Sequence, residues 1–130
     1  MRILRKIKWF LQRGRRGWAD CDLWSLDMYL SGWMPHAMRR LIKIKHAVPT
    51  EIIMQFEFPD ESGNFSKEAI EKALARWSDI LEQIAIGFEA ANTITNLDCN
   101  WKDDAEYERL KQLKQTGLTL FVEHYDSLWD

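Results

Sequence analysis

Residues 66–94 of this 130-residue chain carry the pattern that most limits how it can fold. Apolar side chains recur there in alternating steps of four and three residues, at Ile70, Leu74, Trp77, Leu81, Ile84, Phe88 and Ala91. This spacing puts them on one side of an α-helix. Ser66, just before the run, is a typical N-cap. The pattern therefore predicts a long helix whose apolar seam is buried in a helical core.

Two other segments show the same amphipathic pattern. One begins at Asp20 or Asp22, since either carboxylate suits the positive end of a helix dipole. Pro35 lies inside this helix and predicts a kink or a short break. The other segment spans about residues 104–128. Gly117 at its middle allows either the close approach of a neighbouring helix or space for a ligand.

The remaining segments are shorter. Residues 1–13 are basic and amphipathic, which favours a first helix docked on the core; the alternative is an arm for a membrane surface or nucleic acid. Residues 46–65 form a long connection in which residues 51–58 can hold a short extended segment. At this length the chain can bury a core without disulfide or metal support. We therefore expect one all-α domain over residues 1–130, a bundle of three long helices plus a short N-terminal helix.

The net charge of −2 is distributed unevenly. Residues 1–45 hold eleven Lys or Arg against three Asp or Glu, a balance of +8, whereas residues 46–130 hold seven against seventeen, a balance of −10. Such asymmetry indicates either an anion-binding face or attraction between the two halves, within the fold or between subunits of a homo-oligomer. The second interpretation is favoured, because nucleic acid repels a net-acidic chain.

The seven tryptophans are many for this length, and we expect most of them to fill the core, although tryptophan is also common at binding hot spots. Cys21 and Cys99 lie outside any CxxC pair, which indicates free thiols and a reducing compartment. No apolar run approaches the roughly 20 residues needed to cross a bilayer. Arg5, Lys6 and Lys8 interrupt the N-terminal apolar stretch, unlike a signal peptide. We therefore expect no membrane partner.

Motifs that carry chemistry are sparse. The three histidines lack the spacing of zinc ligands. No GxSxG, HExxH, kinase or P-loop signature is present in the sequence. We therefore expect no catalytic residue, no metal and no cofactor. The alternative is a small enzyme in which Asp27 and His124 form an acid–base pair, although a histidine on an apolar helix face is more often a core residue.

The basic turn at residues 14–19 and the helix start after it form the predicted binding site. Asp27 falls on the apolar stripe of that helix, where a carboxylate needs a partner, and we expect Arg16 or Arg13 to pair with it. The remaining arginine and Trp18 would then face outward as a clamp for an anion or an aromatic ligand. In the alternative, Asp27 only ties the turn to the helix. The complete candidate set is Arg13, Arg15, Arg16, Trp18, Asp20, Trp24 and Asp27.

Four sequence blocks carry a family resemblance: RGWADCDLWSLD (residues 16–27), Pro35 followed by Arg39 and Leu41, WSDILEQIAIGFE (residues 77–89) and GLTLFVEHYDSLWD (residues 117–130). Together they resemble a group of small proteins encoded by tailed bacteriophages. The resemblance implies a viral protein acting in the host cytoplasm, and it implies no particular activity. The group often has Gly-Tyr-Pro after the second helix, where this chain has Ala-Val-Pro at residues 47–49.

The leading functional hypothesis is therefore a non-enzymatic phage accessory protein, active in host takeover or against host defence. It would bind a host protein or sequester a small anionic ligand such as a signalling nucleotide. A structural or assembly component of the virion is the first alternative, and the small enzyme with Asp27 and His124 is the second.

Overall fold

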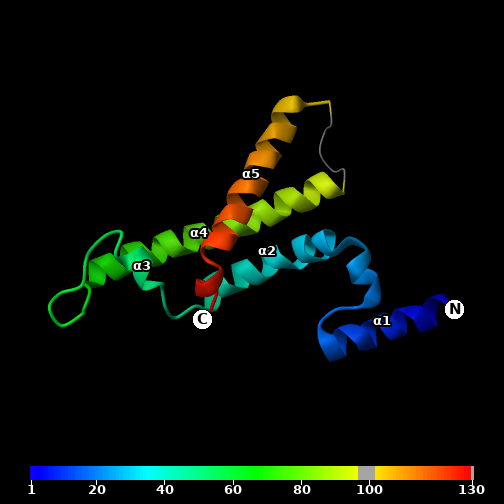
Figure 1. The fold of residues 1–130 in the computed structure, drawn as a ribbon, viewed down its shortest axis with the longest axis horizontal. Helices are drawn as coiled ribbons and strands as arrows, with labels where there is room; N and C mark the ends of the chain where they lie inside the picture. The colour runs from blue at the N-terminus through cyan, green and yellow to red at the C-terminus, as the bar shows by residue number, and fades with distance from the viewer. Residues whose placement is uncertain (97–101, 130) are drawn as a thin grey trace.

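The computed structural model describes residues 1–96 and 102–129, and within them it contains helices and turns but no strand (Figure 1). The helices are α1 (Arg2–Arg16), the 3-10 helix η1 (Asp20–Ser25), α2 (Leu26–Ile44), α3 (Thr50–Ile53), α4 (Lys67–Thr95), α5 (Asp104–Glu123) and the 3-10 helix η2 (Tyr125–Ser127). The predicted all-α class is confirmed. The predicted Cys99 thiol lies outside the described residues.

The longest helix, α4, is the centre of the bundle. α2 runs along one side of α4, α5 crosses it and α3 packs beside its first half (Figure 1). The helix begins where the sequence predicts, because the hydroxyl of Ser66 accepts a hydrogen bond from the amide of Ala69 at 3.2 Å. The apolar seam is buried along most of its length, with Trp77 only 1% exposed, whereas Ile70 at the first turn is exposed. Burial of this seam supplies the main hydrophobic stabilisation of the fold.

Helix α2 continues unbroken through Pro35, so the predicted short break is absent. Proline removes one backbone hydrogen bond and costs about 3 kcal/mol in a helix interior. Pro35 is buried, and its neighbours Met34 and Met38 belong to the core formed with α4. Packing against α4 therefore offsets the local cost of the proline.

One arginine ties α2 to α4. The Arg39 guanidinium donates to Glu82, with Nη2 to Oε1 at 2.9 Å, and to Glu89, with Nη2 to Oε2 at 3.0 Å. The hydrogen bonds from Arg39 lower the pKa of Glu89. The same contacts raise the pKa of Arg39. Planar, two-sided recognition of this kind is a property of arginine that lysine does not share.

Three predicted boundaries were wrong, and the extended segment that the sequence left open is absent. The helix expected to begin at Asp20 or Asp22 starts as the 3-10 helix η1, and α2 begins only at Leu26. Residues 51–58 do not form an extended segment. Ile52 and Ile53 belong to the short helix α3, where they are buried, and a turn follows this helix. α5 ends at Glu123, and the last residues form η2, in which the Ser127 hydroxyl donates to Glu51 at 3.3 Å. α1 extends to Arg16, so the first half of the expected turn, residues 14–16, is helical.

The expected burial of most tryptophans was also wrong. Of the six within the described residues, only Trp77 is buried. Four are between 37% and 76% exposed, namely Trp18, Trp24, Trp33 and Trp129. Three of these four lie in the first third of the chain. Much of the tryptophan surface in that region is therefore exposed to solvent and does not contribute to the core.

The crossing of α4 and α5 depends on two glycines. A Cβ added to Gly117 would lie 2.5 Å from the Cα of Gly87, and a Cβ added to Gly87 would lie equally close to the Cα of Gly117. Both distances are far below van der Waals contact, so the two backbones touch directly. Of the two roles predicted for Gly117, the close approach of a neighbouring helix is confirmed.

The substitution Gly117→Ala is expected to lower the free energy of unfolding by about 1–3 kcal/mol, because the two backbones have to separate. The matched control is Gly32→Ala in α2, where the new methyl group meets no atom within 4 Å. There the better helix propensity of alanine should raise stability by up to about 1 kcal/mol. Urea denaturation of both variants measures the difference, and equal stabilities would contradict the crossing.

Candidate functional site

Helix α1 lies at one end of the molecule, beside the start of α2 and away from α5 (Figure 1). Its tertiary contact is with η1. None of its fifteen residues, all of which the structure describes, is buried. The prediction that the N-terminal helix docks on the core was therefore wrong. The alternative that the sequence left open, an arm, agrees with this position.

The contact between α1 and η1 uses the charged side of the helix. Gln12 and Asp20 bond reciprocally, with Gln12 Nε2 donating to the Asp20 carboxylate at 2.7 Å and the Asp20 amide donating back at 3.1 Å. Lys8 adds an ion pair to Asp20 at 3.8 Å. Trp9 packs edge-on against Trp24, with ring centroids 6.0 Å apart. The helix is held by polar and aromatic contacts on this side.

The buried carboxylate of this region is Asp22. Asp22 is 8% exposed. Its carboxylate accepts a hydrogen bond from Arg13 Nε at 2.9 Å and another from the backbone amide of Ala19 at 2.7 Å. The hydrogen bond from Arg13 is the main cause that lowers the pKa of Asp22 to about 2, and the Ala19 amide adds to it. The same pair raises the pKa of Arg13. A charge that is removed from water needs this kind of full pairing.

The turn after α1 is shaped by Gly17 and Arg16. Gly17 ends the helix with a φ of +81°, in the left-handed region where glycine is favoured. Its carbonyl accepts the hydroxyl of Tyr29 at 2.7 Å. The Arg16 guanidinium lies 3.8 Å over the ring of Trp18 and forms an ion pair with Asp20. Arg16 and Trp18 are thus engaged with each other and with their own chain.

The predicted pairing of Asp27 with Arg16 or Arg13 was wrong. Asp27 is exposed, and it has no hydrogen-bond or ion-pair partner among the described residues, whereas Arg13 and Arg16 pair with Asp22 and Asp20. The clamp of an outward arginine and Trp18 stays a prediction: Arg16 lies over the Trp18 ring, and Trp18 is 37% exposed. Arg15 is the one arginine of the turn that has no pairing partner within the part of the chain described.

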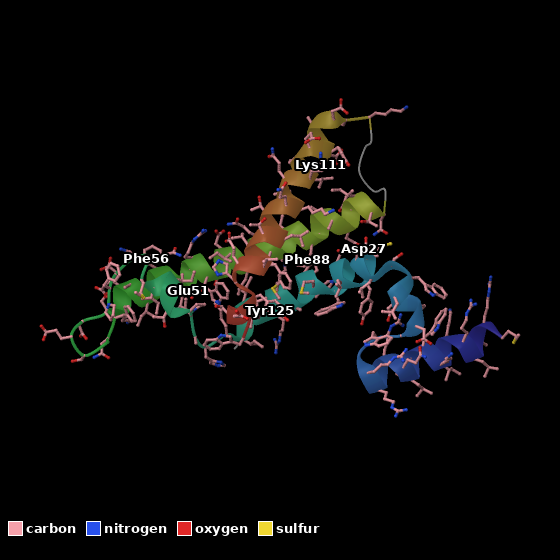
Figure 2. All side chains as sticks on the ribbon, viewed as in Figure 1. Asp27, Glu51, Phe56, Phe88, Lys111 and Tyr125 are labelled. Atoms are coloured by element: carbon pink, nitrogen blue, oxygen red, sulfur yellow. The ribbon has the colours of Figure 1, made fainter. Side chains whose placement is uncertain are left out.

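Because the charged side of α1 faces η1, its apolar side faces outward. The exposed side chains are Ile3, Leu4, Ile7, Phe10 and Leu11, each between 49% and 74% exposed. Lys8, Gln12 and Arg15 border a shallow groove along this strip. In Figure 2 side chains project from α1 both toward η1 and on its open side, away from the bundle. Sequence reasoning omitted these apolar residues from the candidate site, although their spacing was visible.

A second candidate is a hollow of about 210 Å³ where α2, α4 and α5 meet. Leu30, Phe88 and Leu118 contribute apolar walls, and Asp27 and Lys114 contribute charges. Neither charged group has a partner among residues 1–96 and 102–129. Asp27 therefore belongs to this hollow and not to the arginine turn. The sequence pattern gave no sign of Lys114.

Asp27 and His124 do not form a pair. The ring of His124 packs on Trp77 with centroids 5.4 Å apart, whereas Asp27 shares its hollow with Phe88 and Ala91. Those positions on α4 are about 15–20 Å apart along the helix axis. Figure 2 shows Asp27 well away from Tyr125, the neighbour of His124. Within the described residues, no group of three or more His, Cys, Asp or Glu could hold a metal ion.

Comparisons with protein-family models, with curated proteins and with solved structures find no match to this chain. Among the described helices, none combines the length and apolar character needed to cross a bilayer. The geometry of α1 and of the hollow is therefore the basis for a functional proposal.

The substitution Asp22→Asn is expected to release α1 at neutral pH, because it removes the charge that Arg13 and the Ala19 amide contact. Trypsin should then cut faster around residues 13–16, and the near-ultraviolet dichroism of the Trp9 and Trp24 pair should change. The matched control, Asp27→Asn, removes an exposed and unpaired carboxylate and should leave the arm docked.

The pH dependence follows from the same carboxylate. Its folded pKa of about 2 lies below the ordinary value of 3.8. The stabilisation is therefore complete above pH 4 and is lost only as the pH falls through about 2. An arm that detaches between pH 7 and pH 5 would contradict the pairing of Asp22.

Proposed function

We propose that this chain is a non-enzymatic binding protein whose working surface is the apolar side of α1. The observation that carries the proposal is the orientation of this helix, which docks through its charged side and exposes its apolar side. An amphipathic helix in a globular protein ordinarily turns its apolar stripe inward. Large exposed apolar patches commonly mark interaction sites. The bundle of α2, α4 and α5 is then the rigid support that presents the arm.

The resemblance to tailed-phage proteins gives this proposal a setting. In that setting the protein is an accessory protein that engages a host component in the host cytoplasm. The internal pairing of Arg13 and Arg16 speaks against the anion clamp as the main site, because only Arg15 keeps a free guanidinium there. A surface of five apolar side chains suits a docking partner better than a small anion.

A photo-crosslinking residue at position 10 tests this function in host cells, since Phe10 is the most exposed side chain of the apolar strip, at 74%. We expect specific adducts, to protein or to lipid, identified by mass spectrometry. The matched control is the same residue at position 122 on α5, where Val122 is 73% exposed and far from the arm. Adducts at position 10 no richer than those at position 122 would overturn the proposal.

The hollow between α2, α4 and α5 favours a second function, the sequestration of a small ligand. Asp27 and Lys114 are unpaired at an apolar cavity, an arrangement typical of sites that orient a ligand with a few polar groups. The cavity of about 210 Å³ suits a ligand smaller than a nucleotide. Its ligand would carry an anionic group for Lys114 and a donor for Asp27.

Native mass spectrometry of protein purified from cells tests this second function. We expect a co-purifying mass that is lost in the variant Lys114→Ala, because the ligand then loses its cationic partner. Lys111→Ala is the matched control, since Lys111 pairs with Glu108 on the surface of the same helix at 3.1 Å. An identical mass in the two variants would exclude the hollow as the ligand site.

A further inference from the structure

We infer that the partner of α1 is the surface of an anionic lipid bilayer, in which the helix lies flat with its apolar side in the interface. The inference rests on the proposed function and names the class of partner. It replaces the expectation of no membrane partner, which was based on the absence of a segment that crosses the bilayer. A helix in this position lies parallel to the membrane plane, so it needs no segment long enough to cross the bilayer. It does need an apolar strip, a basic opposite side and access to a flat surface.

The charged residues of α1 are all basic. The segment from Met1 to Arg16 contains seven Lys or Arg and no Asp or Glu. Short basic helices with low mean hydropathy and a pronounced apolar strip are typical of peripheral membrane anchors. The cytoplasmic leaflet of a membrane carries anionic lipids, which attract basic segments close to it. The charge and the apolar strip of α1 therefore complement the two layers of a membrane surface.

The positions of the cations around the helix agree with this orientation. At 3.6 residues per turn, the apolar side chains occupy about 120° of the circumference. Lys6 borders this sector on one side, and Arg15 and Lys8 border it on the other. Long basic side chains at such edges keep their alkyl stems in the apolar layer and their charges at the headgroups. Lys6 and Arg15 are free to do so, because neither has a partner in the described residues.

The geometry of docking gives α1 the access that a planar surface requires. Its contacts to η1 come from Trp9, Gln12, Arg13 and Arg16, on the side opposite the apolar strip. The whole length of the strip is therefore open, at one end of the molecule (Figure 1). A body held on the far side of the helix does not obstruct its contact with a bilayer.

A second copy of the chain is the competing occupant. Two α1 strips facing each other would bring the edge cations of both copies that are unpaired in the described chain, Lys6 and Arg15, close together, which is repulsive. The acidic half of a second copy does expose Phe56 and Phe58. The hollows beside these residues measure about 170 and 290 Å³ and adjoin at Glu57 and Ser66. A lipid surface, however, meets the whole apolar strip and the cations at both of its edges at once, so it fits better.

Vesicle co-sedimentation of the full chain tests the inference, with phosphatidylcholine vesicles that contain or lack phosphatidylglycerol. We expect strong binding only to the anionic vesicles. The variant Ile7→Ser with Phe10→Ser should reduce binding at least tenfold, because it removes two of the five apolar side chains of the strip. The variant Lys6→Gln with Arg15→Gln should reduce it roughly fivefold for each cation. The control Val122→Ser, an exposed apolar site on α5, should bind as the unchanged protein does.

The remaining outcomes overturn the inference. Absence of binding to anionic vesicles removes it, and protein adducts at position 10 in the crosslinking experiment would then leave the proposed function standing. Binding that persists in the Ile7 and Phe10 variant identifies the arm as a general polyanion-binding segment, as for nucleic acid. Self-association in light scattering that is lost in the same variant assigns the strip to a second copy. Circular dichroism of each variant confirms that the bundle remains folded.

Discussion

The fold depends on covering the apolar seam of α4. Trp77, Leu81 and Ile84 are almost fully buried there, and a single helix cannot bury such a seam alone. α2 covers one side and α5 covers another, at a crossing tight enough that Gly87 and Gly117 touch through their backbones. These helices cover the apolar seam of α4, and no residue of α1 is part of the core that they form.

The place of α1 is decided by polar chemistry. Asp20 and Asp22 present two carboxylates from one short 3-10 helix, and they collect Lys8, Gln12, Arg13 and Arg16 from the facing side of α1. Such contacts are directional, whereas hydrophobic burial is not. They therefore fix which side of α1 faces the body. The exposure of its apolar side is a consequence of that choice.

Much of the fold could be predicted from the sequence, because periodicity over long segments is a strong signal. It located α2, α4 and α5, and it correctly assigned Ser66 as a cap. It misplaced the buried carboxylate by five residues. The chain from Asp20 to Ser25 is a 3-10 helix with three residues per turn, so a phase counted at 3.6 residues per turn does not hold across it. Asp22 consequently faces inward. Asp27 is in phase with the buried Ser31 and Met34 of α2, but it lies in the first turn of that helix, where it borders the open hollow and stays exposed.

The candidate site was predicted only in part, for a related reason. The pairs between α1 and η1 join residues on opposite sides of a turn, and no helical spacing reveals them. The short apolar run at residues 51–58 was ambiguous because strands and buried helical turns share that pattern. Lys114 lies at the hollow only because three separate helices, α2, α4 and α5, meet there. Tertiary contacts of this kind have no local signature.

The low pKa of Asp22 has a further consequence for how the arm can be controlled. A carboxylate that remains charged far below neutrality makes the position of α1 insensitive to the acidity that a cell can reach. Arg13 also keeps its charge at every physiological pH, so neither partner of the pair is neutralised there. Helix α1 therefore stays docked through its charged side, with its apolar strip outward, over the whole pH range of a living cell.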